Sequence, residues 1–259
     1  MATPRALVLR AAGTNCDLET QYALTRAGFE AQRLHVFRLM EDPSPLMAAQ
    51  MLVIPGGFSY GDDVAAGKIL ANQMLHRLAE PLNEFVRCDK LMLGICNGFQ
   101  VMIKSGLLPE GRVAPGQAHR SATLGWNDSG RFEDRWVHLR SDSDRCVLLP
   151  PGQVISLPVA HGEGKFIPAD DQVLSRLRDN RQVALRYVDA QGRPGPYPAN
   201  PNGSVDDVAG LCDPSGRLLG LMPHPERFVD ILQHPQWTRG QVRAADGLAL
   251  FERARAYFR

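Results

Sequence analysis

The chain has 259 residues, 44% of them hydrophobic and 22% charged, with a formal net charge of +1, as is usual for a soluble globular protein. This balance argues against a nucleic-acid-binding or membrane-surface protein, and the length fits a single domain over residues 1–259. Because the N-terminal residues MATPRALVLR lack the long apolar core of a signal peptide and no apolar run reaches the roughly 18 residues of a membrane span, we expect a cytoplasmic protein.

In the first half of the chain, short apolar runs alternate with helical patterns. Strands are expected at 6–9, 31–36, 51–54 and 91–95, and helices at 18–27, 66–86 and 97–104. Asp17 is placed to cap the first helix, and Pro81 to kink or break the second. Such alternation with short connections is typical of a parallel, doubly wound sheet.

The pattern changes in the second half, where strands are expected at 135–140, 153–160, 183–188 and 218–222 with fewer helices between them. Asp246 is placed to cap a final helix. The predicted fold class is therefore α/β, a flavodoxin-like doubly wound, mostly parallel sheet with helices on both faces and antiparallel additions in the C-terminal half. Residues 192–203, GRPGPYPANPNG, are too rich in proline for a helix or a strand and predict a long loop.

One cysteine lies where a strand is predicted to end and a helix to begin. Cys96 stands between Gly94 and Gly98 in LMLGICNGFQ (91–100). In an open α/β sheet, chemistry gathers beyond the carboxyl ends of the strands, and a sharp strand-to-helix turn with this glycine spacing is the nucleophile elbow, best known as G-x-S-x-G. A helix N-terminus also favours a thiolate. Cys96 is thus a candidate nucleophile, and the alternative is a buried structural cysteine.

A histidine with a carboxylate two residues later follows another predicted strand. The strand at 218–222 leads into PHPER (223–227). In extended backbone, residues two apart point the same way, so we expect Glu226 to hold the His224 imidazole in the tautomer that serves Cys96 as a base. The alternative is a rigid surface turn that contains a histidine.

Two glycines end the central strand at 51–54, in the sequence IPGGF (54–58). The backbone N–H groups of Gly57 or Phe58, together with that of Asn97, are candidates for an oxyanion hole. The alternative is a plain loop, because PGG alone carries little information.

Taken together, these motifs resemble the class I (triad) glutamine amidotransferases. The shared stretches are GTNCD (13–17), PGGFSYGD (55–62), GICNGFQ (94–100), RFEDRW (131–136), AHGEG (160–164), NPNGS (200–204) and MPHPER (222–227). They occur in order over nearly the whole chain, which makes them far more specific together than any one alone. The most similar branch of the family supplies ammonia for de novo purine biosynthesis.

The resemblance implies a role for each matching residue. Cys96 corresponds to the nucleophile, His224 to the general base and acid, and Glu226 to the orienting carboxylate. The Cys96 thiolate is expected to attack the side-chain amide of glutamine, and His224 to protonate the leaving ammonia. Water activated by His224 then releases glutamate from the thioester.

The resemblance also implies how the substrate is held and where the ammonia goes. Gln100 and the backbone of His161 and Gly162 correspond to residues that help to hold glutamine. The implied partner is the synthetase subunit of phosphoribosylformylglycinamidine (FGAM) synthase, and the resemblance also allows a small third subunit in the complex. That partner converts formylglycinamide ribonucleotide with ATP, so ATP and Mg²⁺ are expected there, and no cofactor or metal is expected in this chain.

Two charged clusters were candidates for further sites. Asp62-Asp63 is predicted to be a solvated turn or an interface pair rather than a set of metal ligands. Arg131 and Arg135 could bind a phosphate, but their acidic neighbours favour a structural or interface role. The four cysteines outside the elbow lack its context and form no CxxC pair, so we expect them to be structural.

The sequence leaves two alternatives open. One is another glutaminase subunit of the same fold, such as the one serving pyridoxal phosphate synthesis, against which FSYGD (58–62) and NPNGS (200–204) weigh. The other is a non-catalytic flavodoxin-like subunit or redox sensor that keeps Cys96 as a reactive thiol. A sensor needs no orienting carboxylate, so the His-Pro-Glu sequence weighs against it. Labelling of Cys96 by a glutamine-like electrophile, blocked by glutamine, would favour the amidotransferase.

Overall fold

The computed structural model describes residues 2–114 and 121–259. Its strands are β1 (Arg5–Arg10), β2 (Glu30–His35), β3 (Met51–Ile54), β4 (Leu91–Ile95), β5 (Ala122–Trp126), β6 (Glu133–Ser141), β7 (Val154–His161), β8 (Glu163–Pro168), β9 (Val183–Val188), β10 (Val208–Cys212) and β11 (Leu218–Leu221). Its α-helices are α1 (Asp17–Arg26), α2 (Val36–Glu41), α3 (Ser44–Ala48), α4 (Lys68–Arg77), α5 (Ala79–Arg87), α6 (Asn97–Ser105), α7 (Leu107–Glu110), α8 (Asp171–Asp179) and α9 (Asp246–Ala256). Short 3₁₀ turns are η1 (Ser59–Asp62), η2 (Val205–Asp207), η3 (Pro225–Arg227), η4 (Ile231–Gln233) and η5 (Trp237–Arg239).

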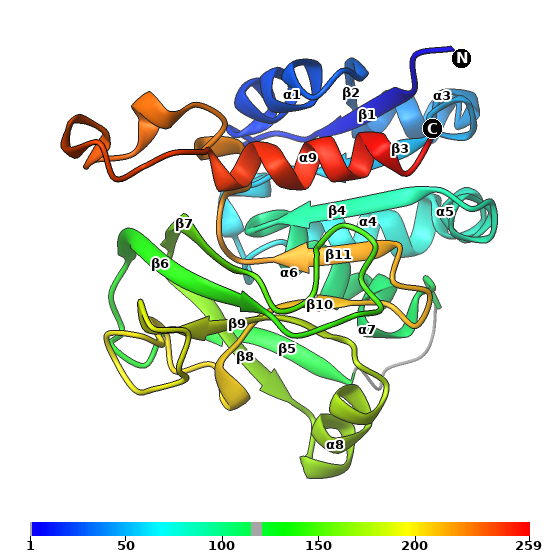
Figure 1. The fold of residues 1–259 in the computed structure, drawn as a ribbon. Coiled ribbons are helices and arrows are strands. Elements are labelled where there is room, and N and C mark those ends of the chain that lie inside the picture. The colour runs from blue at the N-terminus through cyan, green and yellow to red at the C-terminus, as the bar shows by residue number, and fades with distance from the viewer. Residues whose placement is uncertain (1, 115–120) are drawn as a thin grey trace.

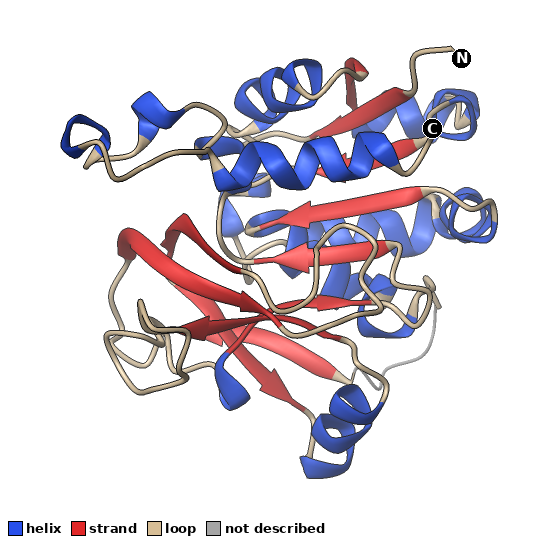
Figure 2. Ribbon diagram, in the orientation of Figure 1, coloured by secondary structure: helices blue, strands red, loops and turns tan. Residues whose placement is uncertain are grey.

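One large sheet organises the molecule (Figure 2). Within the described residues it has nine strands in the order β2-β1-β3-β4-β11-β10-β9-β6-β7. The strands from β2 to β11 pair in parallel, and those from β11 to β7 pair antiparallel. This arrangement confirms the predicted fold class, a doubly wound parallel sheet with antiparallel additions in the C-terminal half.

Helices cover both faces of the parallel half. Figure 1 shows α9 lying across the front of the sheet beside α1, whereas α4 and α6 lie behind it. The strands β3, β4 and β11 are buried at every position, which explains why their sequences MLVI, LMLGI and LLGL are continuous apolar runs. Within the described part of the chain, no helix combines the length and the apolar character needed to cross a membrane.

Three local predictions were wrong, and each has a physical reason. The chain breaks between α4 and α5 at Leu78, and Pro81 lies in the first turn of α5, where a helix needs no N–H partner. Asp17 lies inside α1 after Cys16 at the N-cap, because its carboxylate pairs with Arg10 at 2.6 Å.

The final helix also lacks the predicted cap. Ala245 occupies its N-cap position, and no side chain caps it. The Asp246 carboxylate instead accepts a hydrogen bond from the Ser156 amide at 2.8 Å, which ties α9 to β7.

The second half contains elements that the sequence pattern did not indicate. They are β5, β8, β10 and α8. Only β10 joins the large sheet, whereas β5 and β8 pair with each other in a separate two-stranded antiparallel sheet. The four strands predicted in this half all join the large sheet, whereas the separate two-stranded sheet was not predicted.

The proline-rich loop packs against β6. Residues 192–203 contain no helix or strand, as predicted. The Arg135 guanidinium lies 4.6 Å from the centre of the Tyr197 ring and donates a hydrogen bond to the Pro198 carbonyl at 2.9 Å. Loop and strand together line a cavity of about 660 Å³. Arg135, which also pairs with Glu133 at 3.4 Å, thus has the structural role that its acidic neighbours predicted.

Candidate active site

Cys96 lies at the apex of a strained turn between β4 and α6. Its backbone has φ 50° and ψ −105°, although it is not a glycine. Backbone strain of this kind costs about 1–3 kcal/mol and is usually found at functional sites. The Cys96 amide donates to the Leu221 carbonyl at 2.8 Å, and its sulfur lies 3.8 Å from the Ala160 carbonyl oxygen. The turn is thus held between β11 and the end of β7.

The two flanking glycines are needed for close packing around this turn. A Cβ atom on Gly98 would lie 1.8 Å from the Ile54 carbonyl oxygen, and one on Gly94 would lie 2.8 Å from the Gly98 carbonyl oxygen. Both obstacles are backbone atoms, which cannot rotate away. The G-x-C-x-G spacing therefore follows from how tightly α6 packs on β3 at Gly98 and on β4 at Gly94.

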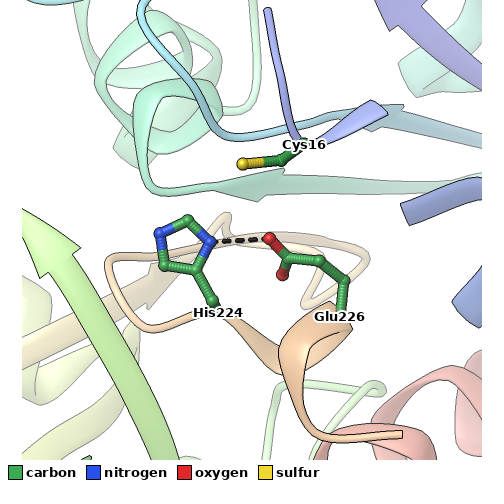
Figure 3. Close-up of side chains that lie close together, drawn as sticks. All are labelled: Cys16, His224 and Glu226. Atoms are coloured by element: carbon green, nitrogen blue, oxygen red, sulfur yellow. Dashed lines mark hydrogen bonds and ion pairs between the residues drawn. The ribbon is translucent and has the colours of Figure 1, made fainter. Parts of the chain in front are cut away.

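His224 and Glu226 form a buried pair next to this elbow. The His224 Nδ1 atom lies 2.6 Å from the Glu226 Oε1 atom, and the two side chains are 2% and 0% exposed. The backbone between them is not extended, contrary to prediction, since Glu226 lies in the 3₁₀ turn η3. The two side chains nevertheless meet, and the carboxylate lies beside the imidazole (Figure 3).

The environment of His224 favours its protonated form. Burial alone would lower the pKa of His224, but the charge of Glu226 and then that of Cys96 act against it, and the pKa is raised well above its ordinary value. Since Nδ1 contacts Glu226, the Nε2 atom is left for another partner. Nε2 is buried and has no hydrogen-bond partner within the described residues. The arrangement can supply a proton at Nε2 to a leaving group.

One of the predicted oxyanion donors is already engaged. The Phe58 amide donates to the Gly13 carbonyl at 3.1 Å, as part of a β-bridge between Thr14 and Gly57. Phe58 is therefore not free to meet an oxyanion in this structure, which leaves Gly57 of the two predicted alternatives. Gly57 has φ 127°, a conformation that favours glycine.

The side chain of Asn97 ties the PGGFSYGD loop to the elbow. Its Oδ1 accepts from the Ser59 amide at 3.2 Å, and its Nδ2 donates to Asp62 at 2.9 Å. Asp62 also accepts from the Gly67 amide at 3.3 Å, and burial raises its pKa. Asp62 is therefore half-buried and bonded to the loop and to Asn97, which corrects the prediction of a solvated turn, and the interface alternative stays a prediction.

Gln100 supports the turn between β7 and β8. Its Nε2 donates to the Glu163 carbonyl at 2.5 Å, and its Oε1 accepts from Asn97 at 2.9 Å. Both ends of the amide are thus bonded within the protein. Gln100 lies between the elbow and the segment 161–163, which includes the two other residues predicted to hold the substrate.

Asn127, which no sequence motif indicated, also holds that segment. Its Nδ2 donates to the His161 carbonyl at 2.8 Å and its amide donates to the Gly162 carbonyl at 2.9 Å. Its Oδ1 lies 3.1 Å from His161 Nδ1, and it is 2% exposed. Burial, with the nearby charge of His224, lowers the pKa of His161 to about 3, so His161 is neutral near pH 7. Asn127 opens NDSG (127–130), which on sequence alone indicates only a turn.

Cys16 was predicted to be merely structural, yet it lies against the His224–Glu226 pair. Figure 3 shows its sulfur pointing toward the imidazole. Ligand atoms of Cys16, His224 and Glu226 all lie within 4.8 Å of one another. The motif GTNCD (13–17) therefore lies next to PHPER in space, although it is far from it in sequence.

Known proteins resemble the chain over nearly its full length. The model of the CobB/CobQ-like glutamine amidotransferase domain matches residues 3–258. Phosphoribosylformylglycinamidine synthase subunit PurQ of Dehalococcoides mccartyi is 45% identical over 257 residues, which cover 98% of this chain and 97% of that protein. Phosphoribosylformylglycinamidine synthase of Drosophila melanogaster is 39% identical over 90% of this chain and 18% of its own length. Among solved structures, PurLQS from Thermotoga maritima has a chain with a TM-score of 0.76 and 31% identity, with 100% of both chains covered.

Proposed function

The chain belongs to the CobB/CobQ-like glutamine amidotransferase family, whose model matches residues 3–258, and from this we infer the reaction of its site. The protein is a glutamine amidotransferase that serves as the glutaminase subunit of FGAM synthase in purine biosynthesis. It passes ammonia to a synthetase subunit, and the complex can include a small third subunit.

The observation that supports the chemistry best is the strained Cys96 elbow beside a buried His224–Glu226 pair. In the proposed mechanism, the Cys96 thiolate attacks the carboxamide carbon of glutamine and forms a tetrahedral intermediate. His224 gives its Nε2 proton to the amide nitrogen, and ammonia leaves. Water then gives a proton back to His224 and attacks the thioester, which releases glutamate and restores the thiolate.

The oxyanion of each intermediate needs backbone donors. The amides of Gly57 and Asn97 are the proposed donors, since Asn97 begins α6, where the first N–H groups have no partner within the helix. The Phe58 amide is bound to Gly13 and would have to be released before it could contribute. We accordingly expect weak glutaminase activity from the isolated chain, which also avoids wasting glutamine when no ammonia acceptor is bound.

The remaining substrates belong to the partner in this proposal. ATP, Mg²⁺ and formylglycinamide ribonucleotide bind to the synthetase subunit, and the complex works in the cytoplasm. Within this chain, the substrate glutamine contacts the turn at 161–163, which Gln100 and Asn127 hold in place.

The test is Cys96→Ala in the complex with the synthetase. FGAM formation with glutamine should be lost, while formation with added ammonia should continue at the wild-type rate. The matched control is Cys88→Ala, which removes a half-buried thiol outside the elbow and should keep both activities. If Cys96→Ala retained glutamine-dependent synthesis, or lost both activities in an intact complex, the assigned roles would be wrong.

A further inference from the structure

A second thiol shares the space around the catalytic histidine. Cys16 lies at the N-cap of α1, directly after β1, and the His224–Glu226 pair follows β11. Figure 3 shows the three side chains converging from these two segments. One ligand atom from each lies within 4.8 Å of the other two. The proposed reaction gives Cys16 no part, so its position calls for a separate explanation.

The cluster is buried and has unused bonding capacity. Cys16, His224 and Glu226 are 1%, 2% and 1% exposed. Within the described residues, His224 Nε2 and Glu226 Oε2 have no hydrogen-bond partner. A buried polar atom without a partner costs about 1–3 kcal/mol. The unused Glu226 Oε2 atom gives the cluster a carboxylate oxygen that a bound cation would satisfy, whereas Nε2 lies on the side of the ring away from Glu226.

The donor set fits a borderline-soft divalent cation. A thiolate, an imidazole nitrogen and a carboxylate oxygen are the usual ligands of Zn²⁺, at about 2.3 Å for sulfur and about 2.0–2.2 Å for nitrogen and oxygen. Donors up to 4.8 Å apart need only small side-chain movements to reach these distances. The two negative charges of Cys16 and Glu226 balance the charge of Zn²⁺.

Burial raises the pKa of the Cys16 thiol, so a cation is needed to hold it as a thiolate, and one neighbour already assists. The Arg227 Nη2 atom donates to the Cys16 sulfur at 3.2 Å, which stabilises a negative charge on that sulfur. Gly56 has no side chain, and a Cβ atom there would lie 3.2 Å from the Cys16 sulfur and 2.8 Å from His224 Cε1.

We propose that Cys16, His224 and Glu226 form an inhibitory binding site for Zn²⁺. Binding releases the thiol proton of Cys16 and the proton shared by the His224–Glu226 pair, and no oxidation is involved. A metal-bound His224 can no longer carry a proton to ammonia or from water, so glutamine hydrolysis stops. The sequence predicted no metal in this chain, and the site needs none for catalysis. The inhibitory effect rests on the proposed role of His224, whereas the binding itself does not.

The first experiment measures inhibition in the complex with the synthetase. Zn²⁺ should inhibit glutamate release by the wild type while ammonia-dependent FGAM formation continues. Cys16→Ser replaces the thiol by a hydroxyl of similar size and should keep basal activity. It should raise the inhibitory Zn²⁺ concentration at least about tenfold, since loss of even a supporting contact to a metal ligand costs about 10–100-fold in metal affinity. Cys88→Ser is the matched control and should remain as sensitive as the wild type. Equal sensitivity of Cys16→Ser and the wild type would overturn the proposal.

The second experiment measures binding without any turnover. In Cys96→Ala, which cannot supply the elbow thiolate, added Co²⁺ should give a thiolate-to-metal charge-transfer band that Zn²⁺ abolishes. The band should be absent from two double variants, Cys96→Ala with Cys16→Ser and Cys96→Ala with His224→Ala. If one of these double variants fails to fold, the other still tests the metal site. A missing band in Cys96→Ala would refute the metal site and leave the glutaminase assignment intact. Glutamine-dependent activity in Cys96→Ala would instead refute the assigned mechanism.

Discussion

Replacing Glu226 by glutamine removes one negative charge from the His224 contact and keeps the size of the side chain. The bond that changes is the 2.6 Å contact between His224 Nδ1 and Glu226 Oε1, with both side chains buried. A hydrogen bond to a charged group contributes about 1.5–3 kcal/mol. If that contribution stabilises the transition state, its loss lowers kcat by about tenfold to 150-fold, because 1.36 kcal/mol corresponds to a factor of 10. A glutamine amide that donates to Nδ1 would also favour the wrong tautomer and deepen the loss.

The pH dependence gives a second readout of the same change. Burial lowers the pKa of His224, and the charge of Glu226 is the largest influence that raises it. In Glu226→Gln the pKa of His224 should therefore fall. His224 then loses its acidic proton at a lower pH, and the alkaline limb of the kcat profile should move to lower pH.

The assay is glutamate release by the complex with the synthetase, measured across pH, with ammonia-dependent FGAM formation as the check on folding and assembly. The matched control is Glu19→Gln, because Glu19 lies nearby but bonds to Arg227 at 3.0 Å. Glu19→Gln should keep the wild-type profile. An activity of Glu226→Gln within about twofold of the wild type, well inside the range expected for a charged hydrogen bond, would show that Glu226 does not orient His224.

Three further predictions concern the elbow, the substrate turn and acid stability. Gly98→Ala should lower the melting temperature and abolish glutamine hydrolysis, because the new Cβ atom would lie 1.8 Å from the Ile54 carbonyl oxygen. The control is Gly195→Ala, where the nearest atom to the new Cβ lies at 3.9 Å, and it should change neither the melting temperature nor the activity. Asn127→Ala should raise KM for glutamine more than it lowers kcat, and an unchanged KM would contradict the role of Asn127 at the turn. The free energy of unfolding, measured by chemical denaturation, should fall by about 1–3 kcal/mol, since the buried carbonyl of His161 loses the Asn127 donor. The pKa of His161 falls from 6.5 to about 3 on folding, so its contribution to stability is complete above pH 6.5 and is lost as the pH falls toward 3, with a slope of up to about 1.4 kcal/mol per pH unit. His161→Gln should remove that slope in denaturation curves between pH 6.5 and 4, and an unchanged slope would refute the assignment.

Local patterns in the sequence were sufficient for the parallel core and for two of the key motifs. Continuous apolar runs predicted the central strands because both of their faces are covered. The glycine spacing around Cys96 predicted the elbow, since only a turn this tight excludes a Cβ atom on either side. The separation of His224 and Glu226 predicted their contact, although the backbone between them is a 3₁₀ turn and not extended. These features depend on residues close together in the chain.

The tertiary structure decided everything that depends on contacts between distant segments. It bound the Phe58 amide to Gly13, tied Asp62 to Asn97 and bonded Asn127 to the turn at 161–163. It also brought Cys16, from the other end of the chain, to the catalytic histidine. A sequence pattern records the period and the turns of each segment, but the register between segments follows from how the sheet packs. The sequence therefore determined the reacting groups, and the fold determined which neighbours surround them.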